Sequence, residues 1–400
     1  MKVHLRNPDR TVELPGPAAV REVLSRLEVN PETVLVIHDG TLVTKDHVVG
    51  DDAEIELRPV ISGGAGPARC HACRRPAVLE VARHRCAYCA EHVVDHVRAQ
   101  VRAAIDRYRM MSYGDRVLVA VSGGKDSLAL WDVLLDMGYR ADGLYVGLGI
   151  GAYSTRSAEL VRGFAERRGA KLHPVDLADD FGFDIPQAAT ARERSSCGVC
   201  GLSKRYVFNR GALQHGYDVM ATGHNLDDEA ATLLANVLRW QTPFMARQSP
   251  LLPAAGSGLA KKVKPLYRLG EREMAAYCVV KGLDYVVEEC PMVAGNTVLR
   301  HKDALNELER HSPGTKAQFL FGFLDRVREA HFSDADGDGQ ALVVCADCGM
   351  PTTARAGAAR PSAGGDTVRA DGPEPARCAF CRTRGRVLRV MQPRSEQASA

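Results

Sequence analysis

The chain has 400 residues, of which 45% are hydrophobic and 25% are charged, a composition typical of a globular protein with two or three domains. No apolar run approaches the ~18 residues of a membrane span. Residues 1–6 lack the apolar core of a secretory signal, so we expect a cytoplasmic protein with no membrane partner. Residues 1–60 hold seven Lys/Arg and eleven Asp/Glu, a net charge of −4. Because the whole chain has a net charge of +3, the remaining residues have a net charge of +7. This asymmetry predicts a polyanionic partner for the body of the chain.

Residues 1–64 predict a small separate domain with the order β-β-α-β-β. We expect strands at 3–6, 9–14, 33–40 and 53–60 and a helix at 18–27. The stretch ends at Gly63-Gly64 and resembles ubiquitin-like sulfur carriers of the ThiS/MoaD type, whose terminal Gly-Gly is activated and thiocarboxylated. Two interpretations stay open: cleavage after Gly64 releases a carrier, or Gly63-Gly64 is a flexible linker.

Twelve cysteines in a cytosolic chain favour metal binding over disulfides, and ten of them form five C-x-x-C pairs. The first two pairs predict a tetrahedral zinc site formed by Cys70, Cys73, Cys86 and Cys89. His71, His84 and His92 could substitute as ligands, but four thiolates already fill the coordination shell. The last two pairs predict a second zinc site formed by Cys345, Cys348, Cys378 and Cys381. We expect a disordered insert at 351–377, because these residues are rich in Ala, Gly, Pro and Arg. Residues 377–394 hold six Arg and no acid, which indicates a phosphate-binding surface or a solvated basic face.

Residues 116–127 read Arg-Val-Leu-Val-Ala-Val-Ser-Gly-Gly-Lys-Asp-Ser, which predicts a buried strand, a glycine turn and the start of a helix. Free N–H groups at a helix start bind phosphate, Lys125 adds a cation, and Asp126 suits Mg²⁺. The spacing is not that of a Walker A loop. Ser-Gly-Gly-Lys-Asp-Ser resembles the pyrophosphate loop (PP-loop) of ATP pyrophosphatases, which cleave ATP to AMP and pyrophosphate while they adenylate a substrate.

Strands and helices alternate beyond this loop. We expect helices at 91–112, 158–168, 205–215 and 227–239 and further strands at 142–150, 171–177 and 217–224. This order predicts a parallel α/β sheet covered on both faces, with the ligand at the carboxyl ends of the strands. Gly149 follows the second strand, where a base could stack on the backbone. An acidic trio at 227–229 follows the fourth strand and indicates cations such as Mg²⁺ and Lys. Simple capping of the helix by Asp227 is the alternative, both interpretations can hold, and we interpret Asp228 as functional.

The remaining C-x-x-C pair, Cys197 and Cys200, lacks a second pair nearby, and its candidate partner is Cys290, after an expected strand at 283–287. Three thiolates suit an iron–sulfur cluster with one open iron, whereas direct persulfide and disulfide chemistry is the alternative. We interpret Cys278 as a core residue of a helix at 271–281. Residues 239–268 hold six Lys/Arg and no acid and predict a basic loop, residues 296–331 are helical by pattern, and residues 334–339 predict a linker.

These motifs in combination resemble the tRNA 2-thiouridine synthetase family, the TtuA type and its wobble-uridine relatives, over about residues 70–390. The resemblance implies the following division: a sulfur-carrier domain at 1–64, zinc fingers at 65–95 and 340–394, a Rossmann-like PP-loop catalytic domain at 96–295, and a tRNA-contacting helical segment at 296–333. It implies ATP binding by Ala120, Ser122, Gly123, Gly124, Lys125, Asp126, Ser127, Leu148, Gly149, Gly223 and Asp228. It also implies a 4Fe-4S cluster on Cys197, Cys200 and Cys290, with Lys204 and Asp228 assisting catalysis. The fused carrier and the long insert depart from the family pattern.

The resemblance therefore implies ATP-dependent 2-thiolation of a tRNA uridine, with Mg²⁺, two Zn²⁺ and a ubiquitin-like thiocarboxylate donor, either a separate carrier with its activating enzyme or the chain's own N-terminal domain. In this mechanism the uracil 2-oxygen attacks the α-phosphate of ATP, pyrophosphate leaves, and sulfide attacks carbon 2. The attached carrier favours the T-loop 5-methyluridine over the wobble uridine, and the family suggests a homodimer. A PP-loop ligase or amidotransferase for a small molecule, and a non-catalytic tRNA-binding or sulfur-relay protein, are the alternatives.

Overall fold

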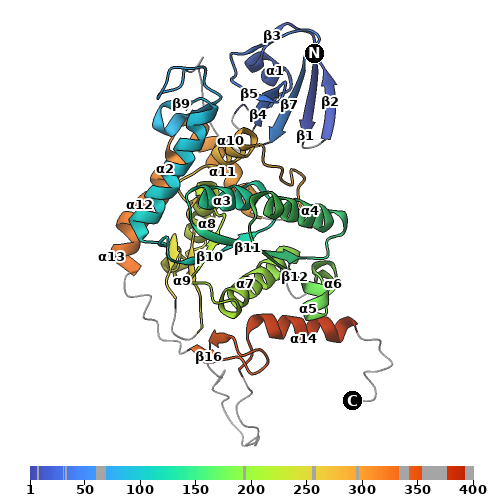
Figure 1. The fold of residues 1–400 in the computed structure, drawn as a ribbon, viewed down its shortest axis with the longest axis vertical. Helices are drawn as coiled ribbons and strands as arrows, with labels where there is room; N and C mark the ends of the chain where they lie inside the picture. The colour runs from blue at the N-terminus through green and yellow to red at the C-terminus, as the bar shows by residue number, and fades with distance from the viewer. Residues whose placement is uncertain are drawn as a thin grey trace, which may run out of the picture.

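The computed structural model describes residues 1–6, 9–29, 31, 34–59, 69–191, 195–254, 258–293, 297–332, 342–353 and 376–391. Gly63 and Gly64, the expected linker at 334–339 and most of the expected insert at 351–377 lie outside these residues. Figure 1 shows the N-terminal domain at one end of the molecule, the central sheet in the middle and the C-terminal helix α14 (Ala379–Met391) at the other end. No helix in the described part of the chain is long and apolar enough to cross a membrane.

A six-stranded sheet forms the centre, in the order β12-β11-β10-β13-β15-β14. Its strands are β10 (Arg116–Val121), β11 (Arg140–Gly147), β12 (Leu172–Asp176), β13 (Val219–Thr222), β14 (Leu251–Leu252) and β15 (Lys261–Val263). All neighbouring pairs are parallel except β14 with β15. Because the strand order reverses direction at β10, the carboxyl ends of β10 and β13 border the crevice in which such sheets bind ligands.

Helices cover both faces of this sheet, because β10 is apolar on both sides. One core surrounds Trp131 and Phe164 and includes α2 (Ala90–Tyr108), α3 (Lys125–Asp136), α4 (Gly151–Arg168), α8 (Leu226–Leu238) and α10 (Glu271–Lys281). The other core surrounds Leu118 and Leu144 and includes α5 (Leu177–Phe181), α6 (Ile185–Thr190), α7 (Ser196–Gln214) and α14. The predicted α/β fold class is confirmed.

The N-terminal domain has the predicted order, with three short strands in addition. Its sheet runs β2-β1-β7-β4-β5, and β3 pairs with β6 beside α1. The bounds are β1 (Lys2–Arg6), β2 (Asp9–Glu13), β3 (Ala18–Ala19), α1 (Val20–Arg26), β4 (Val34–His38), β5 (Thr41–Val43), β6 (Val48–Val49) and β7 (Glu54–Pro59). Leu35, Ile37 and Leu42 pack against α10 and against β8 (Leu79–Val81), so the domain is docked on the rest of the chain through an apolar face.

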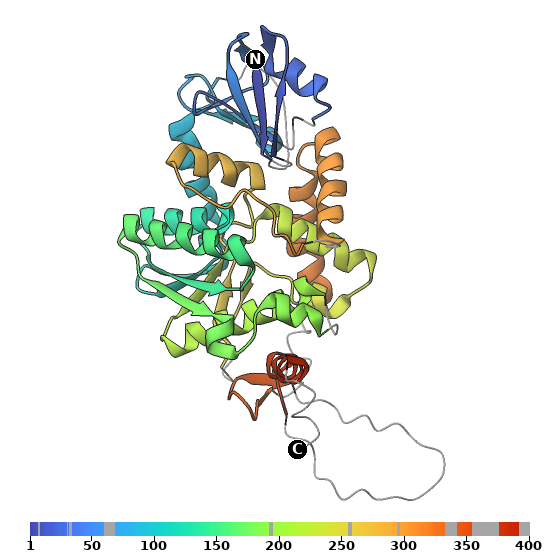
Figure 2. The same ribbon diagram turned by 90° about the vertical axis from the view of Figure 1, so that its right-hand side faces the viewer.

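The C-terminal helices pack beside α8. They are α11 (Thr297–His311), α12 (Thr315–Gly322), the π-helical turn η3 (Phe323–Val327) and α13 (Arg328–Phe332), and Figure 2 shows them in orange along one side of the molecule. The hairpin of β16 (Leu342–Val344) and β17 (Pro351–Thr353) precedes α14. The helical prediction for this region is confirmed.

Three expectations about local structure were wrong. Residues 283–287 are not a strand but an extended connection over the PP-loop, because the Val286 N–H donates to the Gly123 carbonyl at 2.9 Å and not to a strand. The basic stretch at 239–268 is not a loop throughout: it contains α9 (Thr242–Ala246) and the edge strands β14 and β15. Helix α7 begins at Ser196, where the Ser195 hydroxyl caps it, and not at Arg205, so Cys197 and Cys200 lie within the helix.

Candidate active site and metal centres

The PP-loop lies between β10 and α3 and is held by its own hydroxyl groups. The Ser127 Oγ accepts from the Ser122 N–H at 3.1 Å and donates to the Gly124 carbonyl at 3.0 Å. Gly123 has φ +78, and a Cβ there would lie 2.6 Å from Ser157 Oγ, so only glycine fits. A Cβ on Gly223 would lie 2.9 Å from the backbone of Asp126 and Ser127, so the end of β13 packs directly on the loop. The structure therefore brings together the loop residues and Gly223 that the sequence indicated.

Each member of the acidic trio that begins α8 has its own lysine. Lys316 Nζ lies 2.5 Å from Asp227 Oδ1, Lys302 Nζ lies 2.6 Å from Asp228 Oδ1, and Lys264 Nζ lies 2.7 Å from Glu229 Oε2. The predicted capping role of Asp227 was wrong, because Asn225 caps α8 through a reciprocal pair of hydrogen bonds with Asp228. Asp227 is buried and paired with a buried lysine, whereas Asp228 remains partly exposed beside the PP-loop.

Asp228 belongs to a charged network that reaches into the PP-loop. Lys302 bridges Asp228 and Glu271, Lys125 Nζ lies 3.1 Å from Asp126 Oδ2, and Asn225 Nδ2 donates to Asp126 Oδ1 at 3.1 Å. Burial raises the pKa of Asp126 to about 6, against the opposing effect of Lys125. Burial would also raise the pKa of Asp228, but Lys302 and His224 outweigh it and hold that pKa at about 2. Three carboxylates face two lysines here, so the network has room for a further cation.

No sequence motif identified Lys302 or Glu271 as members of this network. Glu271 begins α10, and Lys302 lies in α11, beyond the alternating strands and helices of the sheet. The sequence pattern describes residues 296–331 only as helical, and only the packing of α11 against α8 shows that Lys302 reaches the phosphate loop.

The three backbone positions expected to bind ATP lie at the same sheet edge. Ala120 is the penultimate residue of β10, and Leu148 and Gly149 follow β11, its parallel neighbour. Gly149 has φ +71 and a Cβ there would lie 2.4 Å from the Asp184 side chain, so glycine is required. A cavity of about 740 Å³ opens beside Gly149, between α4 and strands β11 and β12, and is of the size of a small-molecule site.

The three thiols predicted to act together converge at the same end of the sheet. Burial raises the pKa of Cys200, Lys204 opposes this effect, and the nearby Cys290 and Cys197 add to it. Cys197 Sγ lies 3.8 Å from the Met292 carbonyl oxygen. The Leu283-to-Cys290 connection is anchored on Gly123, which brings this thiol group to the PP-loop. A single metal ion needs ligand atoms that all lie within about 4.8 Å of one another. Among the described residues, the sulfurs of Cys197, Cys200 and Cys290 are not this close together.

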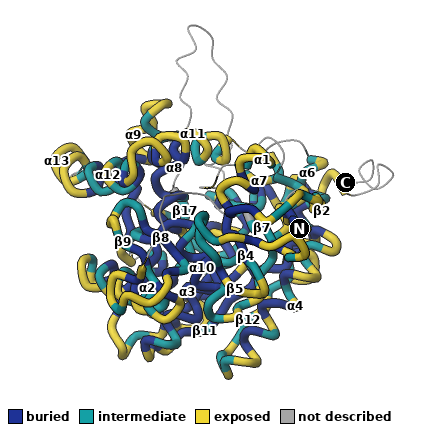
Figure 3. The backbone as a smooth tube through the Cα atoms, turned by 90° about the horizontal axis from the view of Figure 1, so that it is seen from above, coloured by how far each residue is buried: buried dark blue, intermediate teal, exposed yellow. Residues whose placement is uncertain are grey.

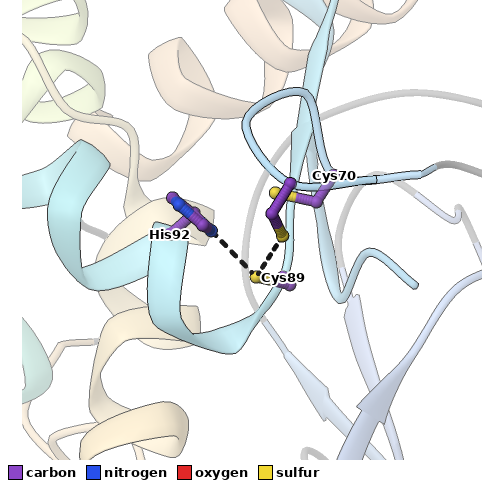
Figure 4. A group of neighbouring side chains, drawn as sticks. Cys70, Cys89 and His92 are labelled. Atoms are coloured by element: carbon purple, nitrogen blue, oxygen red, sulfur yellow. Dashed lines mark hydrogen bonds between the residues drawn. The ribbon is translucent and has the colours of Figure 1, made fainter. Parts of the chain in front are cut away.

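In the first cysteine finger, three of the four predicted cysteines lie together with His92. Cys70, Cys73, Cys89 and His92 have ligand atoms that all lie within 4.8 Å of one another, as Figure 4 shows in part. Cys89 caps α2 and His92 is one turn further along, which places the Cys89 Sγ 3.1 Å from the His92 Nδ1. Cys86 lies outside this set because its position in β9 (Cys86–Tyr88) turns its thiol to the His84 carbonyl, 3.2 Å away. The substitute ligand His92, and not Cys86, completes the group.

The second finger contains all four predicted cysteines. The sulfurs of Cys345, Cys348, Cys378 and Cys381 lie within 4.8 Å of one another. The Cys378 N–H donates to Cys345 Sγ at 3.2 Å, an arrangement that favours a thiolate. Phe380 stacks on Tyr206 of α7 with ring centroids 3.9 Å apart, so this finger is attached to the helix that carries Cys197, Cys200 and Lys204.

Comparisons with known proteins agree with this architecture. Residues 94–293 match the PP-loop domain family, and residues 3–64 match the ThiS family. The tRNA-5-methyluridine(54) 2-sulfurtransferase of Thermus thermophilus is 49% identical over 284 residues, which cover 71% of this chain and 87% of that protein. The protein of the same name from Pyrococcus horikoshii is 40% identical, over 71% of this chain and 90% of that protein. The chain belongs to the tRNA-5-methyluridine(54) 2-sulfurtransferase family. The predicted family membership is confirmed.

A solved structure supports the fold of the same region. The U34-tRNA thiolase NcsA from Methanococcus maripaludis, solved with its 4Fe-4S cluster, has a TM-score of 0.59 at 24% identity. The match covers 66% of this chain and 89% of NcsA. Members of the tRNA-5-methyluridine(54) 2-sulfurtransferase family are enzymes, and the chain has the PP-loop, the thiols and the ThiS domain in one polypeptide.

Proposed function

We propose that the chain is an ATP-dependent tRNA 2-sulfurtransferase that acts on the 5-methyluridine of the T-loop. The observation that carries this proposal is the contact between the segment that leads to Cys290 and Gly123 of the PP-loop. It joins a site for cleaving ATP to a group of thiols and to Lys204, as sulfur transfer to an adenylated substrate requires. A ligase for a small molecule has no use for this group of thiols.

The charged network supplies the adenylation step. The uracil 2-oxygen attacks the α-phosphate of ATP, and the bond to the β-phosphate oxygen breaks. The N–H groups of residues 123–125, with Lys125, stabilise the charge that develops on pyrophosphate. The excess of carboxylates around Asp126 and Asp228 fits one Mg²⁺, whose preferred ligands are carboxylate and phosphate oxygens. Sulfide then attacks carbon 2, and AMP leaves with the former 2-oxygen.

Cys197, Cys200 and Cys290 fit a 4Fe-4S cluster better than a single ion, because a cluster spreads its thiolates over separate irons. Such a cluster would supply one open iron for sulfide. Lys204 lies one helical turn after Cys200 and places a positive charge beside the incoming sulfur. The two fingers fit one zinc ion each, with Cys₃His and Cys₄ ligand sets.

The N-terminal domain fits the role of sulfur donor. The Arg58 guanidinium, near the end of β7, lies 5.6 Å from the centre of the Tyr285 ring, and Tyr285 precedes the residue that bonds to Gly123. The strand that leads to Gly63-Gly64 therefore ends beside the PP-loop. Intact-mass measurement on protein from its own host tests whether Gly64 becomes a free carboxyl terminus; recovery of the full-length chain alone contradicts release of the domain.

Mass spectrometry of nucleosides in tRNA from a gene-deletion strain tests the proposed reaction. We expect 2-thio-5-methyluridine to disappear while the wobble thiouridines persist. Loss of the wobble thiouridines would support the same reaction on a different nucleotide, the U34 for which NcsA is named. If no thionucleoside changes, the sulfurtransferase proposal is wrong.

A further inference from the structure

The turn between α8 and α9 presents large apolar side chains to solvent. Leu238, Trp240 and Phe244 are 63%, 76% and 61% exposed, and every residue from 238 to 244 is exposed. In Figure 2 this turn projects at the right-hand edge of the molecule, and Figure 3 shows α9 at the periphery. Exposure of two neighbouring aromatic rings on a well-ordered turn marks a binding surface more often than a single exposed leucine does.

The backbone of this turn holds the indole outward. The Trp240 N–H donates to the Val237 carbonyl at 3.1 Å, and the Gln241 N–H donates to the Asn236 carbonyl at 2.9 Å. These two bonds form a Schellman motif, which places Trp240 at the left-handed position with φ +48. Glycine usually occupies this position because a side chain is strained there. The chain therefore has a tryptophan in a strained position where the folded protein gains no burial from it.

The charged residues that flank the two rings in the sequence are positive. Arg239 and Arg247 flank them and are exposed, and residues 239–268 hold six Lys/Arg and no acid. Exposed aromatic rings beside exposed arginines suit single-stranded nucleic acid, whose bases stack on rings while phosphates pair with guanidinium groups. The helix that leads to the turn begins at the active site, and its 13 residues span about 20 Å, a distance within the reach of one bound tRNA.

We propose that Trp240 and Phe244, flanked by Arg239 and Arg247, form a stacking platform for unpaired bases of the substrate tRNA. The proposal rests on the proposed function and assigns a surface to its substrate. The platform lies outside the PP-loop, the thiol group and both fingers, so it contributes to tRNA affinity and not to the chemistry of ATP.

The chain has two tryptophans, and this allows a direct test. Trp131 is fully buried, whereas Trp240 is 76% exposed, so acrylamide quenching and emission at long wavelength report on Trp240. We expect tRNA to protect the long-wavelength emission from acrylamide in the wild-type chain. The Trp240→Phe variant should lack this signal and keep most of the affinity, because phenylalanine still stacks.

The Trp240→Gly variant separates binding from folding. Glycine relieves the strained position, so the melting temperature should stay equal or rise, while the Kd for tRNA should rise about tenfold. In the Arg239→Ala/Arg247→Ala variant, the slope of log K for tRNA binding against log salt concentration should become shallower, by the amount expected for about two lost phosphate contacts. Pyrophosphate release per bound tRNA should match the wild type.

Unchanged tRNA affinity in Trp240→Gly would overturn the platform. Sedimentation that shows a dimer in the wild type and a monomer in Trp240→Gly, at equal tRNA affinity per protomer, would assign the surface to a second copy and also overturn it. Failure of the proposed function gives a different result, since the wild-type chain would then thiolate no tRNA.

Discussion

The two cysteine fingers take their ligands from short stretches of chain, whereas the phosphate site takes its charged groups from helices far apart in sequence. In the first finger, Cys89 and His92 are three residues apart in one helix start. At the phosphate site, Lys316 reaches Asp227 across 89 residues, and Lys302 comes from the same C-terminal region. Spacing in the sequence can reveal the first kind of site. The second kind exists only once α11 and α12 pack against α8.

The largest expected effect concerns the first cysteine finger and its candidate ligand His92, which cysteine spacing did not identify. His92→Ala should remove one of two zinc equivalents and open the first finger, because bound metal supplies the folding free energy of such a small unit, about 10 kcal/mol or more. Cys86→Ala is the matched control and should retain both equivalents. Metal analysis of the purified variants decides this, and loss of zinc in Cys86→Ala with retention in His92→Ala would restore the Cys₄ assignment.

The next effect tests the site that only the fold assembles. Lys302→Ala leaves Asp228 and Glu271 without their shared cation, next to where ATP phosphates would bind. We expect kcat/KM for ATP in pyrophosphate release to fall about 10²- to 10³-fold, or about 3–4 kcal/mol, with partial rescue by Lys302→Arg. Lys264→Ala, which removes the lysine of the neighbouring Glu229, is the control and should lose far less. Equal losses in the two variants would show that the lysines only hold the helices in place.

How much could be predicted from the sequence follows the same division. The PP-loop, Gly223 and the two cysteine pairs of the second finger were identified from patterns a few residues long. In the structure Gly223 packs on the PP-loop, and the four cysteines lie close to one another. Spacing does not show to which side of a short strand a thiol points, so it could not place the Cys86 thiol at the His84 carbonyl. Asn225 was overlooked as the cap because three acids follow it. Trp240 lay within a stretch that composition described only as basic, and its exposure depends on how α8 ends.

The smallest effect tests how the local finger is attached to the rest of the fold. Glu273 of α10 is buried between Arg83 and His96, with its Oε1 2.7 Å from the His96 Nε2. Burial alone would raise its pKa, but Arg83 and His96 hold that pKa well below the usual 4.5. Because the folded pKa is depressed, the stabilisation is complete above about pH 4.5 and is lost as the pH falls toward the folded pKa.

Glu273→Gln should therefore lower the free energy of unfolding by about 2 kcal/mol at pH 7, since Arg83 loses its partner charge while the shape is kept. The difference from wild type should shrink as the pH falls below 4.5, because the Glu273 carboxylate of the unfolded wild-type chain then takes up a proton while that of the folded chain stays ionised. Urea unfolding at pH 7 and pH 3.5 measures this. Glu91→Gln removes a carboxylate that pairs with Arg75 in the same finger but is exposed, and it should change the stability at neither pH. A pH-independent difference for Glu273→Gln would mean that the carboxylate acts through packing, and the attachment of the finger would then be apolar.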